Sequence, residues 1–195
     1  MTPALTALAT VAQICLGDPC AALARAEPLA AEPARAAKCR EVASAACEMG
    51  ADPVEVVALA WGESKLNASA VSPTGVGGAL QVSGVGCNAW MRAGSPGAYS
   101  GHPVRLVEGK ACDVVAAGVW QWTRRLDRAG GDVREAACAY NAGSCPASKV
   151  RRCGKADKSR LCRGWRWAGS VAGLVRRMRA SVDLASGRES AGGAL

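Results

Sequence analysis

The chain has 195 residues, of which 50% are hydrophobic and 21% are charged, and its formal net charge is +8. This length suits one compact domain with tails, and the balance of apolar and charged residues excludes a globally disordered chain. An N-terminal apolar run over residues 3–16 is too short and too polar to cross a bilayer, so we predict no membrane span.

Residues 1–33 are expected to form an N-terminal helix, over 3–15, followed by a Pro- and Ala-rich linker. Two interpretations of this segment stay open. No Lys or Arg precedes Arg25, which argues against a signal peptide. However, Ala24 and Ala26 are two small residues separated by one position, and this pattern resembles a weak cleavage site.

The helical signals that follow predict a mainly α domain over residues 34–184. The clearest start lies at Asp52, a capping residue followed by Pro53 and, three residues after the cap, by Glu55. No segment alternates long enough to predict a strand, and 65–78 and 84–110 are expected to be turn-rich loops. Helices are expected near 34–49, over 53–64, across 112–126, from 132 to about 140, and over about 168–184. Residues 185–195 are expected to form a flexible tail.

Ten cysteines are high usage for a chain of this length, and their number is even. No C-x-x-C occurs and His102 is the only histidine, so we predict no metal site and no cofactor. Disulfides formed in an oxidising compartment are favoured, and isolated buried thiols are the alternative. Cys39 and Cys47 are too far apart to bond if they share a helix, because eight residues span about 12 Å.

The positive charge is concentrated in residues 149–179, which we call the basic segment. It contains eleven basic residues and one acidic residue, Asp157, whereas residues 1–148 are nearly neutral. Such a segment attracts polyanions such as nucleic acid, anionic lipid or an acidic cell-wall polymer; a merely solvated surface is the alternative. No helix-turn-helix, zinc-finger or RNA-binding signature accompanies it, so specific nucleic-acid binding is not expected.

Glu63 is the strongest candidate for chemistry. It continues the apolar face of its helix, formed by Val56, Leu59 and Ala60, and it falls at the C-terminal end. Burial and the helix dipole both raise the pKa of a carboxyl group in that position, as a general acid requires. A glutamate that simply reaches solvent at a helix end is the alternative.

The residues around Glu63 decide between these alternatives. Glu63-Ser64 is followed by Asn67, by Ser-Pro-Thr-Gly over residues 72–75, by Gly-Ala-Leu-Gln over 78–81 and, well downstream, by Ala-Tyr-Asn-Ala-Gly over 139–143. In this order and spacing the blocks resemble the soluble lytic transglycosylases, bacterial relatives of goose-type lysozyme. Ala79 and Leu80 depart from the usual Leu and Met of the third block.

The resemblance implies a lysozyme-like single domain with helices around a saccharide-binding cleft, an extra N-terminal helix, and disulfides that staple it. It also implies cleavage of the β-1,4 bond between N-acetylmuramic acid (MurNAc) and N-acetylglucosamine (GlcNAc) in peptidoglycan, with formation of 1,6-anhydroMurNAc. Glu63 would be the single general acid and base. Ser64, Gln81, Tyr140 and Asn141 would bind substrate or support the glutamate.

Several alternatives remain open at this point. A goose-type muramidase would cleave the same bond with water, and a catalytically retired protein would only bind the cell wall or belong to a virion. Trp61 and Trp90 are either core residues or sugar platforms. Trp120 and Trp122 cannot share a helix face, so one of them is expected to line a groove or to reach solvent. A monomer outside the cytoplasm, in the cell envelope or on a phage virion, is the expected setting.

Overall fold

The computed structural model describes residues 15, 17–73, 75–98, 104–107, 109–150, 153–154 and 157–185. Its elements are α2 (Pro19–Ala26), η1 (Pro28–Ala31), α3 (Pro33–Glu48), α4 (Pro53–Ser64), α5 (Gly84–Arg92), β1 (Val104–Val107), β2 (Lys110–Asp113), α6 (Val114–Arg128), α7 (Val133–Ala142), α8 (Ala147–Val150) and α9 (Arg160–Ala185). The predicted mainly α class is therefore confirmed. The helix expected over 3–15 and the tail expected over 185–195 lie outside the described residues, except for residues 15 and 185.

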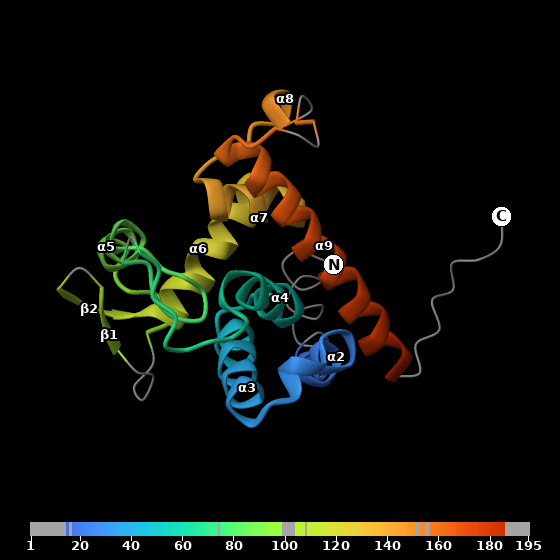
Figure 1. Cartoon of the computed structure of the whole chain (residues 1–195). Coiled ribbons are helices and arrows are strands. Elements are labelled where there is room, and N and C mark those ends of the chain that lie inside the picture. The colour runs from blue at the N-terminus through green and yellow to red at the C-terminus, as the bar shows by residue number, and fades with distance from the viewer. Residues whose placement is uncertain are drawn as a thin grey trace, which may run out of the picture.

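Helix α4 forms the centre of the domain, and other helices surround it (Figure 1). Residues 53–61 are buried without interruption, as expected for a helix that is apolar on every side. Helices α2, α3 and α9 pack directly against it. The long α9 also packs along α2 and α7, so it joins the two ends of the domain.

The segment expected as a linker before residue 34 contains α2 and η1, and the Asp18 carboxylate caps the start of α2. Two further regions differ from the sequence prediction. Residues 84–110 are not only turns: α5 occupies 84–92, and β1 pairs with β2 in an antiparallel hairpin that matches Val104 with Asp113. Helix α9 begins at Arg160, eight residues before the predicted start, and Arg166 in its first turns donates to the carbonyls of Gly154 and Asp157. Both differences arise from contacts between segments rather than from local propensity.

All ten cysteines pair, which confirms the disulfide prediction. Two bonds, Cys15–Cys47 and Cys20–Cys39, attach the chain before and within α2 to α3, so Cys39 and Cys47 bond to separate partners. The others are Cys87–Cys112, Cys138–Cys145 and Cys153–Cys162. None of the described helices has the length and apolar character to span a membrane.

Candidate active site

Helix α4 ends at the candidate acid. Its start is fixed by Asp52, whose carboxylate accepts the N–H of Val54 over 2.8 Å. Its end is abrupt, because Lys65 and Leu66 both take positive φ angles, 57° and 58°, which non-glycine residues adopt at a cost of roughly 1–2 kcal/mol each. Glu63 therefore lies in the last turn, where the buried helix reaches the surface of a cleft.

A loop over residues 78–82 lies against this helix end. The Ser64 hydroxyl donates to the carbonyl of Ala79 over 2.7 Å and so connects α4 to the loop. Gln81 has a φ of 48°, and its side-chain amide donates to the carbonyls of Gly78, at 2.9 Å, and Ala70, at 3.3 Å. Ser64 and the Gln81 amide nitrogen thus shape the backbone of the site.

Gly78 is needed where this loop meets α6. Its φ is +79°, and a Cβ there would lie 2.8 Å from a side-chain carbon of Val114. Any other residue would strain the backbone and push the loop away from α6. The Gly-Ala-Leu-Gln block therefore contains a glycine for a steric reason that the structure makes visible.

Tyr140 connects the third block to the fourth. It lies near the end of α7, and its hydroxyl donates to the carbonyl of Leu80 over 2.9 Å. Asn141 follows, and α7 ends at Gly143 with a φ of 88°. The Cys138–Cys145 disulfide encloses this turn, so a short covalent loop holds both Tyr140 and Asn141.

These segments border a cleft of about 780 Å³. Glu63, Gln81, Tyr140 and Asn141 all line it, whereas Ser64 does not. The structure thus brings together four of the five predicted site residues and gives Ser64 a supporting position behind them. Glu63 is the only carboxylic acid among the described residues that line the cleft.

The cleft changes the ionisation of two of these groups. Burial raises the pKa of Glu63 from 4.5 to about 7. Burial, and secondarily the negative charge of Glu63, raises the pKa of Tyr140 well above its usual value. At neutral pH the site therefore holds a carboxyl group that is about half protonated and a tyrosine that stays neutral.

Five arginines of the cleft were not predicted from the sequence as site residues. Arg124, Arg125 and Arg128 line it from α6, Arg92 from the end of α5 and Arg160 from the start of α9. Only Arg160 belongs to the basic segment. The spacing of Trp120, Arg124 and Arg128 at i, i+4 and i+8 was the available signal, because it places the three on one face of a helix.

The tryptophans divide between core and cleft. Trp61 and Trp90 are buried, and the Trp90 indole donates to the carbonyl of Pro96 over 3.0 Å. Trp120 is half-buried and lines the cleft, with the Arg124 guanidinium 5.0 Å from its ring centre. Trp122 is fully buried, so the expectation that one of this pair borders a groove is met by Trp120.

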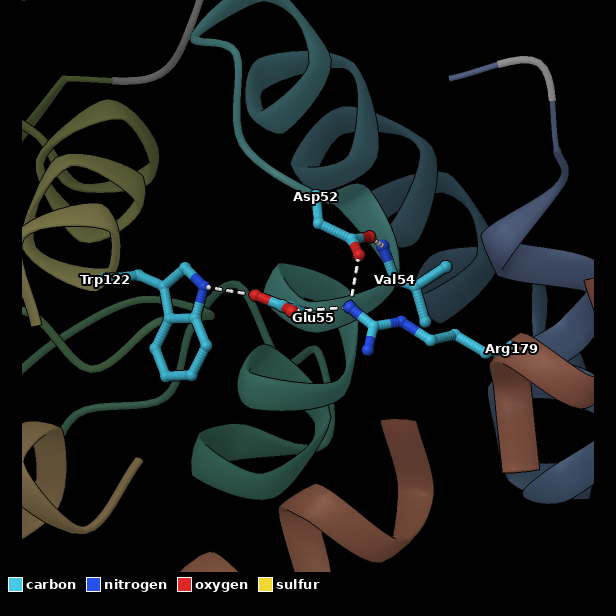
Figure 2. Close-up of polar contacts among 5 residues, drawn as sticks. All are labelled: Asp52, Val54, Glu55, Trp122 and Arg179. Atoms are coloured by element: carbon cyan, nitrogen blue, oxygen red, sulfur yellow. Dashed lines mark hydrogen bonds and ion pairs between the residues drawn. The ribbon is translucent and has the colours of Figure 1, made fainter. Parts of the chain in front are cut away.

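Asp52 and Glu55, at the start of α4, form ion pairs with Arg179 of α9 (Figure 2). Glu55 is only 5% exposed; it accepts from the Trp122 indole over 3.3 Å and from Arg179 over 2.5 Å. Arg179 also pairs with Asp52 over 2.6 Å. These carboxylates anchor α9 to the start of α4, about 12 Å along the helix from Glu63, too far to share its chemistry.

The described residues contain no group of three or more His, Cys, Asp or Glu side chains arranged to hold a metal ion. A scan against protein-family models matches residues 41–161, more than half of the chain, to the transglycosylase SLT domain. A search of curated proteins and a search of solved structures found no match.

Proposed function

The chain belongs to the transglycosylase SLT family, and we propose that it is a peptidoglycan lytic transglycosylase with Glu63 as its single general acid and base. The observation that carries this proposal is the pKa of Glu63, which is about 7, in a cleft whose described lining contains no other carboxylic acid. Such a group is a competent proton donor and, once ionised, a competent base at the same pH.

The reaction requires one proton to leave Glu63 and one to return. The neutral carboxyl protonates the glycosidic oxygen as the bond to C1 of MurNAc breaks, and that oxygen leaves as the C4 hydroxyl of GlcNAc. The carboxylate then accepts the proton of the MurNAc C6 hydroxyl while this oxygen bonds to C1. The product is 1,6-anhydroMurNAc, and no water is consumed.

The neighbouring residues support the acid in this mechanism. The Tyr140 hydroxyl donates its hydrogen bond to the carbonyl of Leu80, so we assign its phenolic oxygen the role of acceptor toward a protonated Glu63. We assign the binding of N-acetyl and hydroxyl groups of the sugar to Asn141 and to the carbonyl oxygen of Gln81's side chain. Ser64 acts through the loop, because its hydroxyl holds Ala79.

The single carboxylic acid favours the transglycosylase over a muramidase. Inverting hydrolases use a second carboxylate to activate water, and retaining hydrolases use one as a nucleophile. The described cleft residues offer no second acid for either role. A substrate hydroxyl as nucleophile removes that requirement.

Mass spectrometry of digested, purified peptidoglycan tests this function. Wild-type protein is expected to release anhydro-muropeptides, Glu63→Gln to release none, and Glu32→Gln, an exposed change outside the cleft lining, to match wild type. Reducing-end products without the anhydro ring would identify a muramidase instead. Wall binding without any cleavage by wild type would identify a retired binding protein.

We also propose where the protein acts and what its basic segment binds. Five disulfides and membership of a family that acts on the cell wall support a location outside the cytoplasm. We assign the protein to the cell envelope or to a phage virion, as a monomer with its catalytic domain in residues 34–184. The basic segment, residues 149–179, is assigned to an anionic wall polymer or a virion partner.

A further inference from the structure

The cleft carries a large excess of positive charge. Five arginines and one glutamate line it among the described residues, and the glutamate is about half neutral at pH 7. Four of these arginines are exposed, and Arg125 is half-buried. An open cavity with this lining concentrates anions.

Three of the arginines also have partners within the protein. Arg125 donates to the carbonyl of Gly143 over 2.8 Å, Arg160 lies 3.5 Å from that of Asn141, and Arg124 stacks on Trp120. These contacts hold the guanidiniums in place, and each guanidinium has further N–H donors that these contacts do not use. Arg92 and Arg128 add two exposed cations, one from each of two neighbouring helices, α5 and α6.

No described salt bridge joins Glu63 to one of these arginines. A guanidinium within about 4–6 Å would lower the pKa of a carboxyl group. The pKa of Glu63 is instead raised, with burial as the cause and no opposing contribution from a described arginine. The positive groups are therefore available to a charge on the substrate.

The glycan backbone of peptidoglycan offers no such charge, because the lactyl group of MurNAc is amide-bonded to a peptide. The carboxylates lie on that stem peptide. Arginine binds carboxylates through paired N–H donors in a fixed plane. We propose, on the basis of the proposed function, that Arg92, Arg124 and Arg128 bind stem-peptide carboxylates, so that the enzyme prefers glycan strands bearing acidic peptides.

The test compares three preparations of one peptidoglycan. The first is intact, the second has its carboxylates converted to amides, and the third has its stem peptides removed by an amidase and the lactyl carboxylates so exposed converted to amides. Anhydro ends released per minute are measured at low ionic strength. Wild type is expected to cleave intact strands roughly tenfold faster than either of the other two. Equal rates on all three, with anhydro products formed, would overturn this inference and leave the proposed function standing. Absence of anhydro products from every preparation would instead refute the proposed function.

Variants assign the preference to the cleft. Arg92→Gln combined with Arg128→Gln is expected to reduce the ratio of intact to amidated rates from roughly tenfold to about two. Arg40→Gln, an exposed charge change on α3 outside the cleft lining, is the control and should keep the wild-type ratio. An unchanged ratio in the double variant would place the recognition elsewhere and overturn the inference.

A binding measurement separates peptide carboxylates from wall phosphates. Glu63→Gln protein is titrated with a soluble anionic muropeptide dimer and, separately, with poly(glycerol phosphate). The double arginine change added to this protein should weaken binding of the muropeptide and leave binding of the phosphate polymer within twofold. The opposite pattern would make the cleft a phosphate-polymer site and refute the proposal.

Discussion

The hydroxyl of Tyr140 donates a hydrogen bond to the backbone carbonyl of Leu80, 60 residues earlier in the chain, over 2.9 Å. Leu80 is fully buried, and a Cβ at Gly118 of α6 would lie 2.6 Å from its side chain. The loop with Gln81 thus contacts both α6 and α7 through Leu80. One hydrogen bond therefore links the two segments that face Glu63.

Tyr140→Phe keeps the ring and removes this hydrogen bond. The Leu80 carbonyl then loses its donor, and we expect a loss of about 1–1.5 kcal/mol in the free energy of unfolding. We also expect kcat to fall by roughly tenfold with a smaller change in KM, because the loop and the acceptor beside Glu63 both change. Denaturant unfolding and steady-state kinetics check this. Wild-type values in both would reduce Tyr140 to a packing ring.

The raised pKa of Glu63 predicts the pH dependence of activity. The acid must be protonated when the glycosidic bond breaks, so the rate is expected to be highest below pH 7 and to fall as the pH rises through about 7. The decline should approach tenfold per pH unit above pH 8. Initial rates on purified peptidoglycan from pH 5 to 9 measure it. A descending limb beginning near pH 4.5 would mean that Glu63 is not buried in the working enzyme.

The same pKa has a consequence for stability. The folded protein holds the Glu63 proton up to about pH 7, whereas the unfolded chain releases it near 4.5, so the contribution of Glu63 to stability is lost as the pH rises between these values. Glu63→Gln should therefore be more stable than wild type at pH 8, by about 1–3 kcal/mol, and nearly equal to it at pH 4.5. Thermal unfolding at the two pH values provides the comparison. A variant that is less stable at pH 8 would contradict this account.

Local signals sufficed for the helices that carry the site. Asp52, Pro53 and Glu55 marked the start of α4, and the structure begins this helix at Pro53. Gly143 marked the end of α7, and it has the positive φ that such a stop requires. These predictions succeeded because capping acts within a few residues. The motif blocks could also be read directly from the sequence, which is why four of the five site residues were found at the cleft.

Long-range contacts explain what the sequence did not reveal. Two glycines in α5 weaken its helical signal. Gly86 nevertheless allows the close approach of α5 to Gln121 of α6, and the Cys87–Cys112 disulfide joins α5 to β2. The arginine lining is assembled from three helices, α5, α6 and α9, so no single window of sequence displays it. Such features depend on the packing of distant segments, which local propensity does not encode.

The Cys138–Cys145 disulfide is expected to matter for activity more than its size suggests. It closes a short loop that contains Tyr140 and Asn141, and for a loop of this length about 2–3 kcal/mol of stability is expected. Replacing both cysteines with Ala should lower the Tm and reduce kcat/KM by more than replacing both Cys20 and Cys39, whose bond lies away from the cleft lining. Equal residual activity of the two folded variants would show that the bond contributes to stability alone.

Arg179 pairs with the buried carboxylate of Glu55, and its loss is expected to destabilise the fold. Arg179→Leu leaves Glu55, 5% exposed, and Asp52 without their cation, so we expect a loss of about 2–3 kcal/mol at pH 8. Burial and the charge of Asp52 raise the pKa of Glu55, and Arg179 partly opposes them. Removing Arg179 therefore raises the pKa of Glu55 further. The folded variant then retains a proton that the unfolded chain releases, and the gap from wild type should grow as the pH rises from 4.5 to 8.

Two further variants isolate this effect. Arg177→Leu removes a more exposed partner, paired with Glu27 over 3.3 Å, and should cost less than about 1 kcal/mol at every pH. Adding Glu55→Gln to Arg179→Leu should recover most of the lost stability at pH 8, because an amide needs no cation and can still accept from Trp122. Thermal unfolding across this pH range measures all three. A gap that does not depend on pH would mean that Arg179 contributes packing rather than charge.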